Sequence, residues 1–198
     1  MFVSTAWKNK LEKMPAWFIS LYAAICSFCV YFCMYAFRKP FTAAGFQGLY
    51  FLKIDYKVWL VSAQLVGYML SKFYGIRFIA GMQSNTRANT IILLIILAWI
   101  MLLFFAITPS PYNIIFLLLN GFPLGMIWGL VFSYLEGRRA TEFMGAVLAI
   151  SFIFSSGVVK TIGKSLVLNH HVSEFWMPFY TGAFFLVPLF LFTWLLNH

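Results

Sequence analysis

Acidic residues are scarce in this chain. Only five of its 198 residues are Asp or Glu, against 14 Lys or Arg, and charged residues of both signs make up 10% of the sequence. A soluble domain has about 25% charged residues, and it could not bury a chain that is 63% hydrophobic. The composition therefore disfavours a soluble enzyme, a disordered chain or a nucleic-acid-binding protein, and it predicts a membrane protein.

Cysteine is also rare, and all three cysteines lie in one apolar stretch. Cys26, Cys29 and Cys33 share one helix face by their spacing, but no His or acidic residue nearby supplies a fourth metal ligand. We interpret them as small apolar packing residues. The sequence also lacks a Ser-His-Asp set, a glycine-rich phosphate loop and paired catalytic carboxylates. Neither an enzyme nor a metal or cofactor site is therefore expected.

Long apolar segments dominate what is present. A helix needs about 20 apolar residues to cross a bilayer. Six such segments predict an all-α, polytopic membrane protein, with a cytoplasmic tail at residues 1–13 and a six-helix bundle at 14–198. The expected spans are Met14–Gly45, Trp59–Ala80, Thr90–Ile107, Tyr112–Leu135, Phe143–Leu168 and Phe175–Leu196. The first and fifth are longer than required, so they must tilt, break or extend beyond the membrane.

The basic residues predict how the spans are oriented. Membrane proteins keep most Lys and Arg residues on the cytoplasmic side. If both termini are cytoplasmic, the inner segments hold Lys8, Lys10, Lys13, Arg77, Arg87, Arg138 and Arg139, and the outer loops hold Lys53, Lys57 and Lys164. The N-terminal region shows no convincing signal-peptide cleavage site, so it is interpreted as an uncleaved first span. We expect a multi-pass protein of a bacterial inner membrane with both termini in the cytoplasm.

Small residues recur at every fourth position in two of the expected spans. They are Gly67, Ser71 and Gly75 in the second span, and Gly121, Gly125 and Gly129 in the fourth. Such stripes allow another helix to approach closely. The contact could be static, or it could slide in a protein that moves, and the stripes do not decide between these alternatives.

Four basic residues fall inside the spans or at their edges, whereas the acids lie in the tail, the loops or helix ends. The basic residues are Arg38, Lys39, Lys72 and Lys160, and the acids are Glu12, Asp55, Glu136, Glu142 and Glu174. A cation in a bilayer is costly without a counter-charge, so an anionic ligand in a water-filled cavity could supply it. Lys72 is too deep to reach water along its helix, whereas the other three could also snorkel to the headgroups.

The loop between the fourth and fifth spans alternates in charge. It contains Glu136, Arg138, Arg139 and Glu142. This loop is either a solvated turn or a salt-bridge latch between helix ends, and a latch would favour one conformation of the protein.

Three stretches carry a resemblance to a known family. They are Tyr35–Phe41 around Arg38 and Lys39, Ser71–Phe73 around Lys72, and the glycine-rich segment from Asn120 to Arg139. Together they resemble the N-terminal six-helix half of a major facilitator superfamily transporter, most closely the organophosphate:phosphate antiporters. The resemblance implies that Arg38 contacts a substrate phosphate and that Lys72 lines a central cavity. Two positions depart from it: Gly75–Gly81 contains no Asp, and Phe154 stands where these antiporters carry a histidine.

The residues and the resemblance together predict half of a secondary transporter that moves a small organic or phosphorylated anion by alternating access. Arg38 and Lys72 are the main expected ligands of the anion, and Lys39 and Lys160 are weaker candidates. The expected partners are the lipid bilayer, the anion, and a second six-helix half or a second copy of the chain. The alternative is a non-transporting membrane protein of the same fold, such as a receptor, a partner subunit or a truncated remnant.

Overall fold

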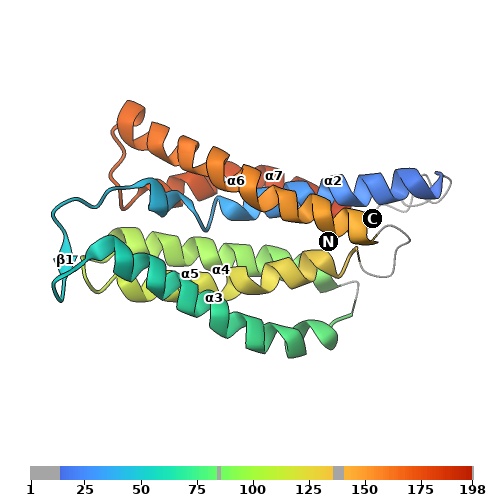
Figure 1. The fold of residues 1–198 in the computed structure, drawn as a ribbon, viewed down its shortest axis with the longest axis horizontal. Coiled ribbons are helices and arrows are strands. Elements are labelled where there is room, and N and C mark those ends of the chain that lie inside the picture. The colour runs from blue at the N-terminus through green and yellow to red at the C-terminus, as the bar shows by residue number, and fades with distance from the viewer. Residues whose placement is uncertain (1–13, 84–85, 136–140, 198) are drawn as a thin grey trace.

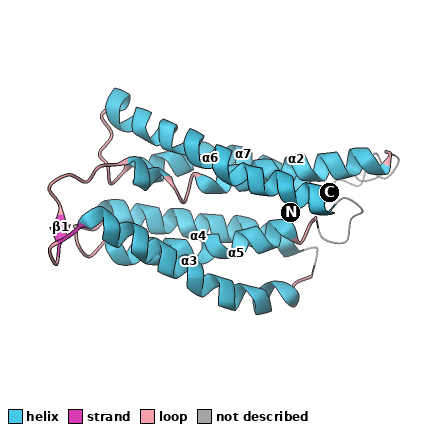
Figure 2. Ribbon diagram, in the orientation of Figure 1, coloured by secondary structure: helices cyan, strands magenta, loops and turns pink. Residues whose placement is uncertain are grey.

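The computed structural model describes residues 14–83, 86–135 and 141–197, and these residues are mainly helical (Figure 2). The long helices are α2 (Ala16–Tyr35), α3 (Tyr56–Ala80), α4 (Arg87–Ile107), α5 (Ile114–Phe132), α6 (Thr141–His170) and α7 (Met177–Leu196). The short elements are the 3₁₀ helix η1 (Pro40–Ala43) and an antiparallel hairpin of β1 (Tyr50–Phe51) and β2 (Ile54–Asp55). The all-α prediction is confirmed apart from this small hairpin, which the sequence pattern did not indicate.

Five of the described helices are long and apolar enough to cross a membrane, as expected of a multi-pass membrane protein. They are α2, α4, α5, α6 and α7. The remaining long helix, α3, has 25 residues but is less apolar, because it contains Gln64, Lys72 and Arg77. The count of six spans therefore stays a prediction, and it depends on α3. The predicted tail at 1–13 lies outside the described residues.

The first predicted span does not continue as one helix to Gly45. Helix α2 ends at Tyr35, and η1 begins after a short turn at Pro40. Proline has no amide hydrogen to donate to a helix, and its ring clashes with the preceding turn. Of the three outcomes expected for this long segment, the structure therefore shows a break.

The helices run side by side along the molecule in two groups of three (Figure 1). Helices α3, α4 and α5 pack together in one group, and α2, α6 and α7 pack together in the other. The groups meet where α4 contacts α7 and where α2 contacts α5. The hydroxyl of Tyr22 in α2 donates a hydrogen bond to the Leu195 carbonyl of α7 (2.9 Å). Helix α2 therefore starts at the same end of the bundle at which α7 finishes.

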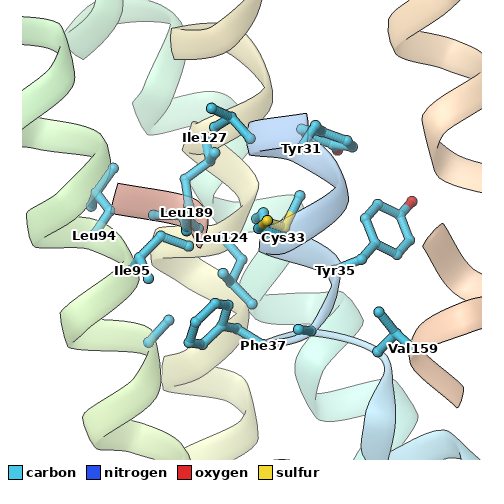
Figure 3. Packing of buried hydrophobic residues seen from close by; sticks show 14 of the residues in the cluster. Tyr31, Cys33, Tyr35, Phe37, Leu94, Ile95, Leu124, Ile127, Val159 and Leu189 are labelled. Carbon is cyan, nitrogen blue, oxygen red and sulfur yellow. The ribbon is translucent and has the colours of Figure 1, made fainter. Parts of the chain in front are cut away.

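Helix α2 contributes to the buried core on two of its sides. Cys33 lies toward Leu124 of α5 and Leu189 of α7, whereas Tyr31 and Tyr35 point toward α6 (Figure 3). The predicted packing role of the cysteines fits their positions, because Cys26 and Cys33 are buried, Cys29 is half-buried, and all three are free thiols.

The two stripes of small residues face each other between α3 and α5. A Cβ atom on Gly67 would overlap the Leu118 carbonyl, and one on Gly121 would overlap the Gln64 carbonyl. The remaining pairs across this contact are Gly125 with Ser71, Gly75 with Met126, and Gly129 with Ile79. Glycine is therefore required where the two backbones approach most closely.

We predict that Gly67→Ala destabilises the protein by about 1–3 kcal/mol, because its added methyl group meets backbone that cannot turn away. Gly157→Ala is the matched control, since a Cβ there would meet nothing within 4 Å. That control should be neutral or stabilising by about 0.5–1 kcal/mol, the cost of glycine in a helix relative to alanine. Thermal unfolding in detergent measures both variants. Equal melting temperatures would contradict the close approach of α3 and α5.

Candidate anion-binding site

The break after α2 leaves backbone carbonyls without helical partners partway along the bundle. Pro40 cannot donate a hydrogen bond back to the preceding turn. Side-chain amides from other helices bind two of the carbonyls at the break. Gln64 Nε2 of α3 donates a hydrogen bond to the Arg38 carbonyl (3.1 Å), and Asn120 Nδ2 of α5 donates one to the Phe37 carbonyl (3.4 Å). Helices α3 and α5 thus hold the break in place.

The two amide side chains also bind each other. Gln64 Nε2 donates to Asn120 Oδ1 (2.8 Å), and Asn120 Nδ2 donates to the Ala98 carbonyl of α4 (2.9 Å). Both side chains are buried, where a polar group without a partner is costly. Neither residue was predicted to belong to the site. The signal that could have found them is an amide side chain inside an otherwise apolar span.

The turn after the break places Arg38 against α3. Its guanidinium carbon lies 4.0 Å from the centre of the Tyr68 ring and 5.8 Å from that of Tyr35. Lys72 Nζ lies 4.9 Å from the same Tyr68 ring and 5.0 Å from the Trp128 ring of α5. Both cations are half-buried. The ring faces attract cations but carry no net charge, so both positive charges persist at the site.

The other two predicted residues lie together on the side of α2 that faces α6. Lys39 and Lys160 line a shallow hollow of about 440 Å³. The rest of its lining consists of Tyr35, Phe152, Ile153, Ser156 and Gly157. The structure therefore arranges the four predicted basic residues as two neighbouring pairs, because the consecutive residues Arg38 and Lys39 meet different helices.

No described acidic side chain forms an ion pair with any of these four cations. Asp55 caps α3 by accepting a hydrogen bond from the backbone amide two residues on (2.8 Å). Glu174 accepts hydrogen bonds from two backbone amides of the segment before β1 (2.8 and 2.6 Å). Glu142 is exposed in the first turn of α6, and Glu12 and Glu136 lie outside the described residues. Within the described chain, the counter-charge for the basic pairs is thus not a protein carboxylate.

The predicted charged latch is only partly covered by the structure. Glu136, Arg138 and Arg139 lie outside the described residues, and Glu142 is exposed. A different basic residue joins helix ends in this region: Arg87 Nη1 of α4 donates a hydrogen bond to the Ser133 carbonyl just after α5 (2.8 Å). The latch itself stays a prediction.

Aromatic side chains extend the site along α2 and α6. Phe154, at the position where the resemblance places a histidine, is 57% exposed. Its ring centre lies 5.8 Å from that of Phe32 and 6.3 Å from that of Phe28. This position therefore offers an apolar surface rather than a proton donor. Among the residues that the structure describes, no group of His, Cys, Asp or Glu side chains could hold a metal ion.

A family model described as "Family of unknown function (DUF5690)" matches residues 40–198. The match includes Lys72 and Lys160 and starts just after Arg38 and Lys39. No curated protein and no solved structure matches the chain. The comparisons therefore assign no activity, and the resemblance to major facilitator transporters stays a prediction.

We predict that Asn120→Leu destabilises the protein by about 1–3 kcal/mol, because it strips hydrogen bonds from the buried Phe37 and Ala98 carbonyls. Asn169→Leu is the matched control, since Asn169 is exposed near the end of α6 and its amide donates a hydrogen bond to the Ser165 hydroxyl one turn away (3.0 Å). Chemical or thermal unfolding in detergent compares the two variants. Equal stability of both would show that the amide network does not support the break in α2.

Proposed function

The chain belongs to DUF5690, a family of unknown function, and we propose a function for it from four basic residues. These residues, which we call the basic face, are Arg38, Lys39, Lys72 and Lys160. The chain is half of a secondary transporter that moves a small organic or phosphorylated anion by alternating access. The observation that carries this proposal is the pair of cations, Arg38 and Lys72, stacked on one Tyr68 ring. No carboxylate among the described residues neutralises them.

The energetics of a cation in a membrane support an anionic ligand. A basic side chain at the centre of a spanning helix costs about 2.5–3.5 kcal/mol. Contacts with Tyr68 and Trp128 recover about 0.5–2 kcal/mol each, but they leave the charge in place. An anion that enters from water supplies the opposite charge. The planar fork of Arg38 suits a phosphate or carboxylate in particular.

The depth of the cations supports transport rather than surface binding. At 1.5 Å per residue, Lys72 lies about 24 Å from the start of α3 and about 12 Å from its end. Secondary transporters bind their substrates near the bilayer midplane, between structural repeats. A site at this depth can be reached from each side in turn if the bundle moves against a partner.

The apolar surroundings of the site support a second helical unit as that partner. Side chains next to the basic residues are strongly exposed, including Met69 (53%) and Ile76 (74%) on α3 and Ile153 (81%) on α6. A second six-helix half, or a second copy of this chain, would cover this face and enclose the anion.

We further propose that α3 is the sixth span and that both termini are cytoplasmic, in a bacterial inner membrane. Helix α3 packs along α5, which is itself apolar enough to span. Lys53 and Lys57 lie at the hairpin end of the bundle, whereas Arg77 and Arg87 lie where α3 ends and α4 begins. The cytoplasmic face would then be the end that carries Arg77 and Arg87.

We predict that Arg38→Gln and Lys72→Gln each weaken anion binding about tenfold or more, because each removes a charge-assisted hydrogen bond. The probes are inorganic phosphate, glycerol 3-phosphate and succinate, measured by calorimetry with the protein in nanodiscs. Uptake of the same labelled anions into proteoliposomes tests transport. Arg77→Gln is the control, since Arg77 is exposed near the end of α3.

Normal binding and uptake in both site variants would contradict the proposal. An equal loss in the Arg77→Gln control would contradict it too, because the effect would then follow net charge rather than the site. Binding that is lost in the site variants, in a protein that transports none of the probes, would favour the alternative of a non-transporting receptor.

A further inference from the structure

The basic face is divided, because two consecutive residues just after the end of α2 meet different helices. Arg38 lies over the Tyr68 ring of α3, whereas Lys39 lines the hollow beside α6. Adjacent residues in a helical turn point about 100° apart, so one compact anion held by Arg38 and Lys72 does not account for Lys39.

The hollow beside α6 holds a second pair of like charges. Lys39 and Lys160 line it together, and both are half-buried. The space beside Gly157 in its lining is free, because a Cβ atom on this residue would meet nothing within 4 Å. Two ammonium groups in a mostly apolar hollow repel each other and lose hydration, and the three described acids lie elsewhere: Asp55, Glu142 and Glu174. The hollow therefore has space for an anion and two ammonium groups that can donate hydrogen bonds to it, but no described carboxylate supplies the negative charge.

The position of Lys160 along α6 makes the missing counter-charge costly. It lies ten residues before the end of α6 at His170, or about 15 Å along the helix at 1.5 Å per residue. Helix α6 has 30 residues, or about 45 Å, whereas the hydrocarbon core of a bilayer is about 30 Å thick. A helix centred on the core would place Lys160 about 7 Å inside its edge, where an ammonium group gains from an anion brought to it.

We propose that Lys39 and Lys160 form a second anion subsite, which takes a carboxylate or phosphate group distinct from the one at Arg38 and Lys72. The inference rests on the proposed function, and it names the substrate class as an organic dianion with an apolar middle. Tyr35 connects the two subsites: its ring lies 5.8 Å from the Arg38 guanidinium carbon and 6.2 Å from the Phe152 ring, and it lines the hollow. The apolar middle would lie against Tyr35 and Phe152.

The same chemistry could come from a lipid, because a phospholipid headgroup also brings an anionic phosphate group to paired lysines. The two sources differ in what they require. A dianionic substrate needs both subsites at once, whereas a lipid needs only Lys39 and Lys160 together with anionic lipid in the membrane.

The test compares dianions with matched monoanions on the protein in phosphatidylcholine nanodiscs. The pairs are terephthalate with benzoate, adipate with hexanoate, and succinate with butyrate. We expect at least one dianion to bind about tenfold or more tightly than its monoanion, the worth of one added charge-assisted contact. Lys39→Gln and Lys160→Gln should remove this preference, because each takes one cation from the second subsite. Lys164→Gln, an exposed position one turn further along α6, should keep the preference, and Arg38→Gln should weaken both classes.

Nanodiscs that contain phosphatidylglycerol form the second arm of the test. One outcome is a rise in melting temperature that requires this lipid and is lost in Lys160→Gln, with no preference for dianions. In that case the subsite exists, and its ligand is a lipid headgroup. No dianion preference and no such lipid effect would overturn the second subsite. If monoanion binding still fell in Arg38→Gln, the proposed function would survive that failure. If no probe bound and no such lipid effect appeared, both proposals would fail.

Discussion

The arrangement of this protein depends on how the carbonyl groups at the break in α2 are satisfied. Backbone polar groups in a membrane have no water to bind, so a helix can stop inside the bundle only where other protein groups replace its hydrogen bonds. Gln64 and Asn120 do so for the carbonyls of Arg38 and Phe37. This is why the chain can leave its helix at Tyr35 and present two consecutive basic residues to different neighbours.

Helix α3 links this support to the site through regular spacing. Gln64, Tyr68 and Lys72 follow one another at intervals of four residues and therefore share one face. On this face, Gln64 donates a hydrogen bond to a carbonyl at the break, the Tyr68 ring lies against the guanidinium of the basic residue there, and Lys72 provides the second cation. The neighbouring face carries the stripe of small residues that lies against α5, so the close approach of α3 and α5 also brings Asn120 and Trp128 to the site.

The same geometry explains why four cations can share one region. Arg38 and Lys72 rest on aromatic rings, which attract positive charge without neutralising it. Lys39 and Lys160 lie beyond Tyr35, so the two pairs are separated by an aromatic ring. The proposed dianion would span this division, with one anionic group at each pair of cations.

The sequence by itself determined the helical, membrane-type character of the chain, the positions of its long helices and the separation of cations from acids. These properties are sums over local residues: a span needs only enough apolar residues in a row. Only the tertiary structure decided that α2 breaks before Pro40, that Gln64 and Asn120 hold the break, and that Lys39 shares a hollow with Lys160. Those features join residues far apart in the chain, and they depend on how far each helix is rotated about its axis. That rotation is set by side-chain packing between helices. The stripes of small residues signal it for α3 and α5, whereas the pairing of Lys39 with Lys160 has no such local signal.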